Sequence, residues 1–205
     1  YFSFLRGQTM DSNFFALISR MRYIARWGLM RNALPENIQE HSHMVAVLAH
    51  ALGVIRRDIF HQPCDVNALA TAALYHDASE ILTGDLPTPI KYHNAEIMSA
   101  YHAVEDLAVQ KLLGMLPPEL RETYADVLAE DKDGDIYPLV KAADKLSAYI
   151  KCIEERKAGN NEFLSAEAQT RAALEASPLP EVQYFLEHFI PAFERDLDEL
   201  GAIGQ

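Results

Sequence analysis

The chain has 205 residues, which is enough for one domain with a substantial core and small for two. Its formal net charge of −12 argues against a nucleic-acid partner and against an anionic membrane surface. The longest apolar run, residues 44–55, is too short to span a bilayer, and the N-terminus lacks the charged and apolar regions of a secretory signal. The two cysteines form no CxxC pattern. We therefore expect a cytoplasmic protein in which an anionic substrate would be bound by a metal ion or a few basic residues.

The first helical pattern follows residues 1–9, which are either a remnant of an expression sequence or a native extension. Ser12 or Asn13 is placed to cap a helix that runs to about Trp27 and ends at Gly28. The end of this segment carries basic side chains that stand out in so acidic a chain: Arg22, Arg26 and Arg31. Their positions alone indicate solvated cations at a helix C-terminus, where positive charge is favoured.

A second helix is expected to start at residues 35–37. Its apolar positions repeat at i, i+3, i+4 and i+7, as on the buried face of a helix: Val45, Leu48, Ala49 and Leu52. His41 lies at the end of the same stripe, whereas His43 and His50 lie off it. A single histidine in such a place is more often a satisfied core residue than a ligand, so a role for His41 depends on partners from elsewhere in the chain.

A third helix, beginning at Asp65 or Asn67, is expected to carry a histidine, an aspartate and a glutamate on one side. At about 100° per residue, His76 lies on the core-facing stripe, and Asp77 and Glu80 converge on the same quadrant. Burying these groups without partners would be costly. An internal hydrogen-bonded cluster is the alternative, but a buried pair of carboxylates needs a cation, so the pattern favours a metal site.

The segment 82–89 contains Thr-Gly-Asp and two prolines, which indicates an ordered loop. It is either a rigid connector or a rim that faces the substrate. Helical patterns follow over residues 92–113, 118–130, 136–157 and 162–176, and over a last helix that starts at 180, reaches Leu200 and is kinked at Pro191. No stretch alternates as a strand would. The expected fold is all-α, a single domain over residues 10–205 with about eight helices.

Asp144 lies beside the apolar stripe of the expected helix 136–157. On spacing alone it is best interpreted as an exposed residue paired with Lys141 or Lys145. Together with His41 and the pair His76-Asp77, however, it completes the order H…HD…D. That order resembles the HD superfamily of metal-dependent phosphohydrolases. Two imidazoles and two carboxylates suit Mn, Fe, Co, Ni or Zn better than Mg or Ca.

Longer motifs narrow the resemblance to the bacterial HD-domain 5′-deoxynucleotidases of the YfbR type. The motifs occur in the same order and spacing as in that family: EHS at 40–42, YHDASE at 75–80, TGDLPTPIK at 83–91, KAAD at 141–144 and GNNEF at 159–163. The likeness extends from about Asn13 to the C-terminal helix. It implies an HD-domain helical bundle and a homodimeric, cytoplasmic enzyme that hydrolyses deoxyribonucleoside 5′-monophosphates.

The resemblance also implies site residues. The metal, one divalent ion such as Co or Mn, would be bound by His41, His76, Asp77 and Asp144. Glu80 would be catalytic. The substrate-binding residues implied are Arg26, Trp27, His41, Asp77, Asp85, Leu86, Pro87, Thr88 and Asp144, with Arg26 orienting the phosphate.

Two other functions stay open at this point. One is a different HD phosphohydrolase, acting on a nucleoside triphosphate, a cyclic dinucleotide or an alarmone, although such charged substrates usually need a larger basic channel. The other is a non-catalytic helical module that binds a structural metal, which would leave Glu80, Arg26 and the Thr-Gly-Asp loop without a role.

Overall fold

The computed structural model describes residues 12–91, 93–129 and 134–201. Every regular element within these ranges is a helix, and the one β contact among them is an isolated antiparallel bridge between Ala25 and Asn37. The all-α helical bundle predicted from the sequence is confirmed. None of the helices in the described ranges is long and apolar enough to cross a membrane. The prediction for residues 1–9 falls outside the described residues.

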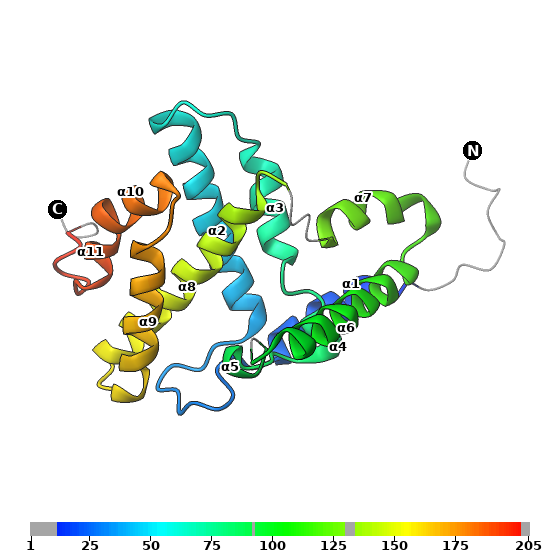
Figure 1. Cartoon of the computed structure of the whole chain (residues 1–205), viewed down its shortest axis with the longest axis horizontal. Coiled ribbons are helices and arrows are strands. Elements are labelled where there is room, and N and C mark those ends of the chain that lie inside the picture. Colours follow the sequence, from blue (N-terminus) through cyan, green and yellow to red (C-terminus); the bar gives the residue numbers. More distant parts are fainter. Residues whose placement is uncertain (1–11, 92, 130–133, 202–205) are drawn as a thin grey trace.

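The larger core is built around helix α2 (Ile38–Val54), which packs against α3 (Val66–Tyr75) and α8 (Tyr137–Lys157). These three helices cross at the centre of the molecule, and α9 (Leu164–Glu175), α10 (Pro180–His188) and α11 (Ile190–Phe193) lie to one side of them (Figure 1). The apolar stripe predicted for the second helix is buried in this core, with Val45, Leu48, Ala49 and Leu52 at most 3% exposed.

A smaller core lies on the other side and joins α1 (Phe14–Ile18), α6 (Ala95–Gly114) and α7 (Pro118–Leu128). Its buried residues include Phe14, Leu112 and Ala78. Ala73 belongs to the larger core and Ala78 to the smaller one. The turn 76–79 therefore passes between the two cores, and this places His76 and Asp77 where the two halves of the bundle meet.

Short elements connect these helices. They are the 3₁₀ helices η1 (Ser19–Tyr23) and η3 (Asn161–Phe163), the π-helix η2 (Ile55–Ile59), and the single turns α4 (Glu80–Thr83) and α5 (Thr88–Lys91). Side chains cap two of the helices: Asn37 accepts from the N–H groups of Gln39 and Glu40, and Asp65 from those of Asn67 and Ala68. The predicted cap of the first helix by Ser12 or Asn13 is wrong, because Asn13 makes no side-chain cap hydrogen bond and Ser12 Oγ donates to the carbonyl oxygen of Met115.

Three helix boundaries differ from the sequence prediction. The first helical segment ends at Tyr23 rather than Trp27, because the chain turns into the Ala25–Asn37 bridge. The third helix ends at Tyr75, before the histidine and aspartate that were expected on it. The final helix ends with α11 near Pro191, and the apolar side chains of Leu197 and Leu200 lie beyond it, 71% and 45% exposed.

The break after Tyr75 has a local cause. The imidazole Nδ1 of His76 lies 2.7 Å from the carbonyl oxygen of Ala73. In an uninterrupted helix that carbonyl would accept from the N–H of Asp77. The backbone instead continues through tighter contacts, from Ala78 N–H to the Tyr75 carbonyl and from Glu80 N–H to the Asp77 carbonyl.

Candidate metal centre and active site

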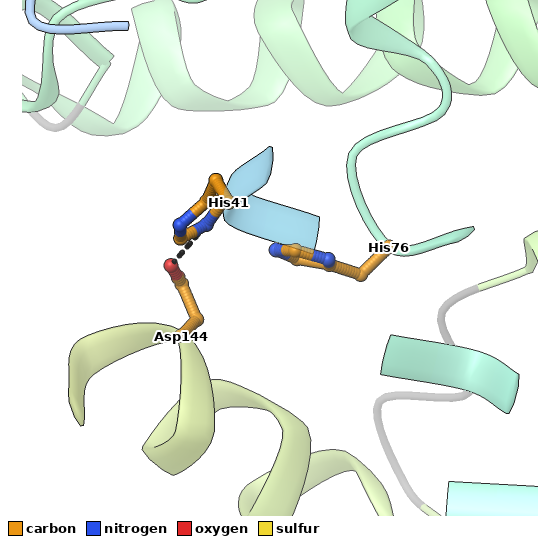
Figure 2. A group of neighbouring side chains, drawn as sticks. All are labelled: His41, His76 and Asp144. Atoms are coloured by element: carbon orange, nitrogen blue, oxygen red, sulfur yellow. Dashed lines mark ion pairs between the residues drawn. The ribbon is translucent and has the colours of Figure 1, made fainter. Parts of the chain in front are cut away.

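Three potential metal ligands converge from separate segments. His41 projects from α2, His76 from the turn after α3, and Asp144 from α8. One ligand atom of each lies within 4.8 Å of the others. Figure 2 shows the three side chains directed at a common point, with His41 Nε2 3.1 Å from Asp144 Oδ1. The structure thus brings together residues that lie about 35 and 70 positions apart in the chain.

The ring nitrogens of both histidines are arranged as in metal-binding imidazoles. Nδ1 of His76 faces the carbonyl oxygen of Ala73 and must therefore donate to it, and Nδ1 of His41 lies 3.1 Å from Oγ of Ser147. The Nε2 atoms of both rings are buried and have no hydrogen-bond partner among the described residues. An Nδ1–H that is held in this way leaves the Nε2 lone pair available to a metal.

This geometry fits a divalent cation. With its Nδ1 protonated, the imidazole of His76 presents the Nε2 lone pair to the carboxylate of Asp77, 3.2 Å away. Such an arrangement is unfavourable in a buried site unless a cation lies between the donors. The mixed nitrogen and oxygen donor set is one that transition metals accept readily.

Asp77 occupies a different position from the three converging residues. Its Oδ1 lies 3.2 Å from Nε2 of His76, and its Oδ2 lies 3.6 Å from both Nε2 of His41 and Nη1 of Arg26. The carboxylate therefore connects the metal cluster with a guanidinium. Its expected role as a fourth ligand stays a prediction.

Opposing charges set the protonation of this cluster. Burial lowers the pKa of His76, which keeps its ring neutral and able to bind a metal. Burial also opposes the negative charge of Asp77 and Asp144, but the neighbouring imidazoles and Arg26 hold the pKa of each carboxyl below its ordinary value. Neutral imidazoles and ionised carboxylates are the forms that bind cations.

Glu80 begins α4 immediately after the turn and is 8% exposed. Within the described part of the chain its Oε2 has no hydrogen-bond partner. Burial, followed by the negative charges of Asp77 and Asp85, raises its pKa to about 9. A carboxyl group with this pKa holds its proton at neutral pH, so a role as proton acceptor requires a positive charge nearby, such as a bound cation, to lower the pKa again.

Arg26 is placed by the short bridge that replaces the expected end of the first helix. Its N–H donates to the carbonyl oxygen of Glu36 at 3.0 Å, and its Nε lies 3.3 Å from the Glu36 carboxylate. The guanidinium is 13% exposed and also faces Asp77. Burial opposes its charge, but the surrounding carboxylates, with Asp77 and Asp144 foremost, raise its pKa above the ordinary value. Interpreting this arginine as a solvated surface cation is therefore wrong.

Trp27 is held by contacts on every side. Its backbone has φ of 58°, in the left-handed region that is uncommon for a non-glycine residue. Its N–H donates to Oδ2 of Asp85 at 3.3 Å, and its indole Nε1 donates to Glu36 at 3.0 Å. The ring meets that of Phe163 edge-on at 5.3 Å between centroids. Asp85 thus lies beside Arg26 and Trp27, although it comes from the segment after α4.

The remaining predicted substrate residues follow Asp85 in the chain. Leu86 and Pro87 are partly buried in the loop between α4 and α5, and Thr88 is the first residue of α5. The sequence did not single out Glu36 or Ser147, two residues that touch site residues directly. The position of Ser147 offered a signal, because it lies one helical turn after Asp144 on the same buried face.

The family model for YfbR-like 5′-deoxynucleotidases matches residues 13–193. The chain belongs to this family. A 5′-deoxynucleotidase YfbR from Shigella boydii serotype 18 is 50% identical over 192 residues, which cover 93% of this chain and 96% of that protein. The family assignment and the HD motif implied by the sequence are thereby confirmed.

Two solved structures extend the comparison to the fold. An HD-domain phosphohydrolase from Listeria innocua has a TM-score of 0.79 at 25% identity, with 90% of each chain covered. The HD phosphohydrolase DatZ of cyanophage S-2L has a TM-score of 0.56 at 26% identity, with 90% of this chain and 96% of that chain covered. The latter structure contains dA and one catalytic Zn²⁺ ion. This YfbR-like chain therefore has the fold of metal-dependent phosphohydrolases as well as the ligand cluster.

Proposed function

We propose that this YfbR-like protein is a metal-dependent 5′-deoxynucleotidase that converts deoxyribonucleoside 5′-monophosphates to deoxyribonucleosides and phosphate. The observation that carries the proposal is the position of Asp77, which contacts the imidazoles of the metal cluster on one side and the buried guanidinium of Arg26 on the other. The proposed cation site and the proposed phosphate-binding group would therefore be adjacent, as the hydrolysis of a phosphate ester requires.

The metal would be a divalent transition ion such as Co or Mn, held by His41, His76, Asp77 and Asp144. When bound, such an ion polarises a phosphate oxygen and lowers the pKa of a coordinated water. Arg26 would bind the phosphate with its planar fork. Its current partners, Asp77 and Glu36, keep the guanidinium charged and fix its direction before the substrate arrives.

Glu80 would accept or relay the proton of the attacking water. It follows Asp77 by one turn, is buried, and has a carboxylate oxygen without a hydrogen-bond partner in the described part of the structure. Removing this group from the mechanism should abolish turnover without removing any predicted metal ligand.

The deoxyribose would lie against Trp27 and the segment Asp85, Leu86, Pro87 and Thr88. A close apolar contact at C2′ would reject a 2′-hydroxyl, because burying that hydroxyl without a partner is costly. The protein would act as a cytoplasmic homodimer on free nucleotides.

A screen of ribonucleoside and deoxyribonucleoside 5′-monophosphates with Mn, Co, Mg and Zn tests the function. We expect phosphate release from dAMP, dGMP and dTMP, and much slower release from AMP. Release of pyrophosphate from a triphosphate would assign the chain to another class of HD phosphohydrolase. No release with any of these metals would favour a non-catalytic metal-binding module.

The Glu80→Ala variant tests the mechanism. It should bind metal and dAMP like the wild type but lose on the order of 10²–10⁴-fold in kcat. Phosphate release near the wild-type rate would show that Glu80 has another role.

A further inference from the structure

The C-terminal half of α8 carries a buried polar network that lies well away from the metal cluster. Its centre is Glu155, which is fully buried and lies 11 residues after Asp144 on α8, about 16 Å along the helix. The Glu155 carboxylate accepts from the N–H of Ala33 at 2.8 Å and from the N–H of Leu34 at 3.0 Å. It also accepts from Nζ of Lys151 and from Nδ2 of Asn160.

The same side chains bind the backbone carbonyl oxygens of the facing segment. Lys151 Nζ donates to the carbonyl oxygen of Leu34, and Asn160 Nδ2 donates to that of Arg31 at 2.6 Å. The N–H of Arg31 lies 3.3 Å from the Glu162 carboxylate. Three N–H groups and two C=O groups of segment 31–34 are therefore held by side chains from α8 and the turn that follows it.

This segment is continuous with the residues proposed to bind the substrate. The carbonyl oxygen of Trp27 accepts from the N–H of Met30 at 2.8 Å and from Nδ2 of Asn32 at 3.4 Å, so a compact turn joins Trp27 to the network. A second contact runs through the rings, because Phe163 packs on Trp27 and Lys151 Nζ lies 5.6 Å from the centre of the Phe163 ring.

We propose that Glu155 is a positioning residue for the deoxynucleotidase reaction, because it fixes the loop that places Arg26 and Trp27 against the substrate. This inference rests on the proposed function. No residue from 24 to 37 is fully buried, so apolar packing contributes little to holding the loop beyond the contact of Trp27 with Phe163. The hydrogen bonds to Glu155 take its place.

An ionised carboxylate suits this position better than an amide. Two backbone N–H groups, an ammonium and an amide all donate to Glu155, and a glutamine would present an N–H₂ group to some of them. Burial alone would raise the pKa of Glu155, but these hydrogen bonds lower it to about 2. The carboxylate is therefore ionised at neutral pH and can accept all four.

Glu181 provides a matched control. It is equally buried, and its Oε1 accepts from Nε of Arg56 at 2.6 Å, so it too forms an ion pair inside the protein. It lies on α10, and its partner Arg56 lies in η2, away from the loop 24–37. The variants Glu155→Gln and Glu181→Gln both disturb a buried ion pair, but only Glu155→Gln changes a side chain that is hydrogen-bonded to the loop 24–37.

The experiment measures kcat and KM for dAMP, metal affinity and thermal stability in the wild type and in both variants. We expect Glu155→Gln to lower kcat/KM on the order of 10- to 100-fold at unchanged metal affinity, and Glu181→Gln to lower stability without this loss. In an Arg26→Ala background, Glu155→Gln should cause a smaller further loss, because only the part of its effect that acts through Trp27 remains.

Three results distinguish the alternatives. A wild type that is inactive on dAMP contradicts the proposed function itself. If the wild type is active and Glu155→Gln behaves like Glu181→Gln, the positioning role is wrong. The role is also wrong if Glu155→Gln lowers kcat/KM by the same factor in the wild type and in the Arg26→Ala variant. If Glu155→Gln does not fold, the variant Asn160→Ser is tested by the same criteria. Its serine hydroxyl can still accept from the N–H of Glu162 but cannot reach the carbonyl oxygen of Arg31.

Discussion

The metal side and the substrate side of the proposed active site are held in place by different forces. The metal side takes His41 and Asp144 from α2 and α8, whose apolar faces form the larger core, and His76 from the turn where that core meets the smaller one. The substrate side is the loop 24–37, in which Leu29 and Leu34 are 75% and 47% exposed. Its position depends on hydrogen bonds to Asp85 and Glu155.

The difference predicts how each side responds to change. Apolar packing is spread over many contacts and tolerates the loss of one, whereas a few directional hydrogen bonds fail when a single partner is removed. We therefore expect the loop 24–37 to open at lower free energy than the metal cluster, which suits a segment proposed to admit and release nucleotides.

The largest effect is expected from removing a ligand on the metal side. His41→Ala should lose both metal binding and turnover, with a drop in affinity beyond the ~100-fold that follows loss of an outer-shell partner. Calorimetric titration of the metal-free protein with Mn or Co measures this. His43→Ala, in which an exposed histidine two positions along the same helix is removed, serves as the control and should bind like the wild type.

The next effect is expected on the substrate side. Arg26→Ala should reduce kcat/KM for dAMP on the order of 10²–10³-fold, because a preorganised positive charge at the phosphate is lost. Arg26→Lys should recover only part of the loss, since an ammonium cannot form the paired contact. Arg22→Ala removes an exposed arginine four residues earlier. If the steady-state kinetics of Arg26→Ala equal those of this control, Arg26 does not bind the phosphate.

A smaller effect is expected from changing a residue that contacts a proposed metal ligand. Ser147→Ala removes the group that faces Nδ1 of His41 and should weaken metal binding about 10–100-fold without unfolding the protein. Ser42→Ala is the matched control, because Ser42 is as deeply buried beside His41 but its Oγ has no partner in the described residues. Equal metal affinity in the two variants would show that the hydroxyl does not orient the ring.

The smallest effect concerns stability and pH on the substrate side. The pKa of Glu155 is lowered from 4.5 to about 2 in the folded protein, so the unfolded chain binds more protons between these values and stability rises with pH there. The contribution of Glu155 is present above pH 4.5 and is lost toward pH 2. Urea unfolding of the wild type and Glu155→Gln should therefore show a stability difference that narrows between pH 5 and pH 3. A difference independent of pH would contradict this.

Local patterns were sufficient for the elements that bury an apolar face. The stripe from Val45 to Leu52 predicted α2 and put His41 at its buried end, where the side chain is 0% exposed. The start of the third helix near Asp65 was also visible in the sequence. The place of Asp144 in the cluster with His41 and His76 was not visible in this way, because spacing alone pointed to an exposed residue paired with lysine. Only the family motif suggested it as a ligand, and its side chain is in fact 36% exposed.

By itself, the sequence determined the family, the helical class and the identity of the converging residues, because hydrophobic period and motif spacing are local properties of the chain. Tertiary structure alone decided that Arg26 is buried. It also decided that Glu155 holds a segment more than 100 positions away. These features depend on hydrogen bonds between segments that are distant in the chain, and no repeating pattern in the sequence indicates such contacts.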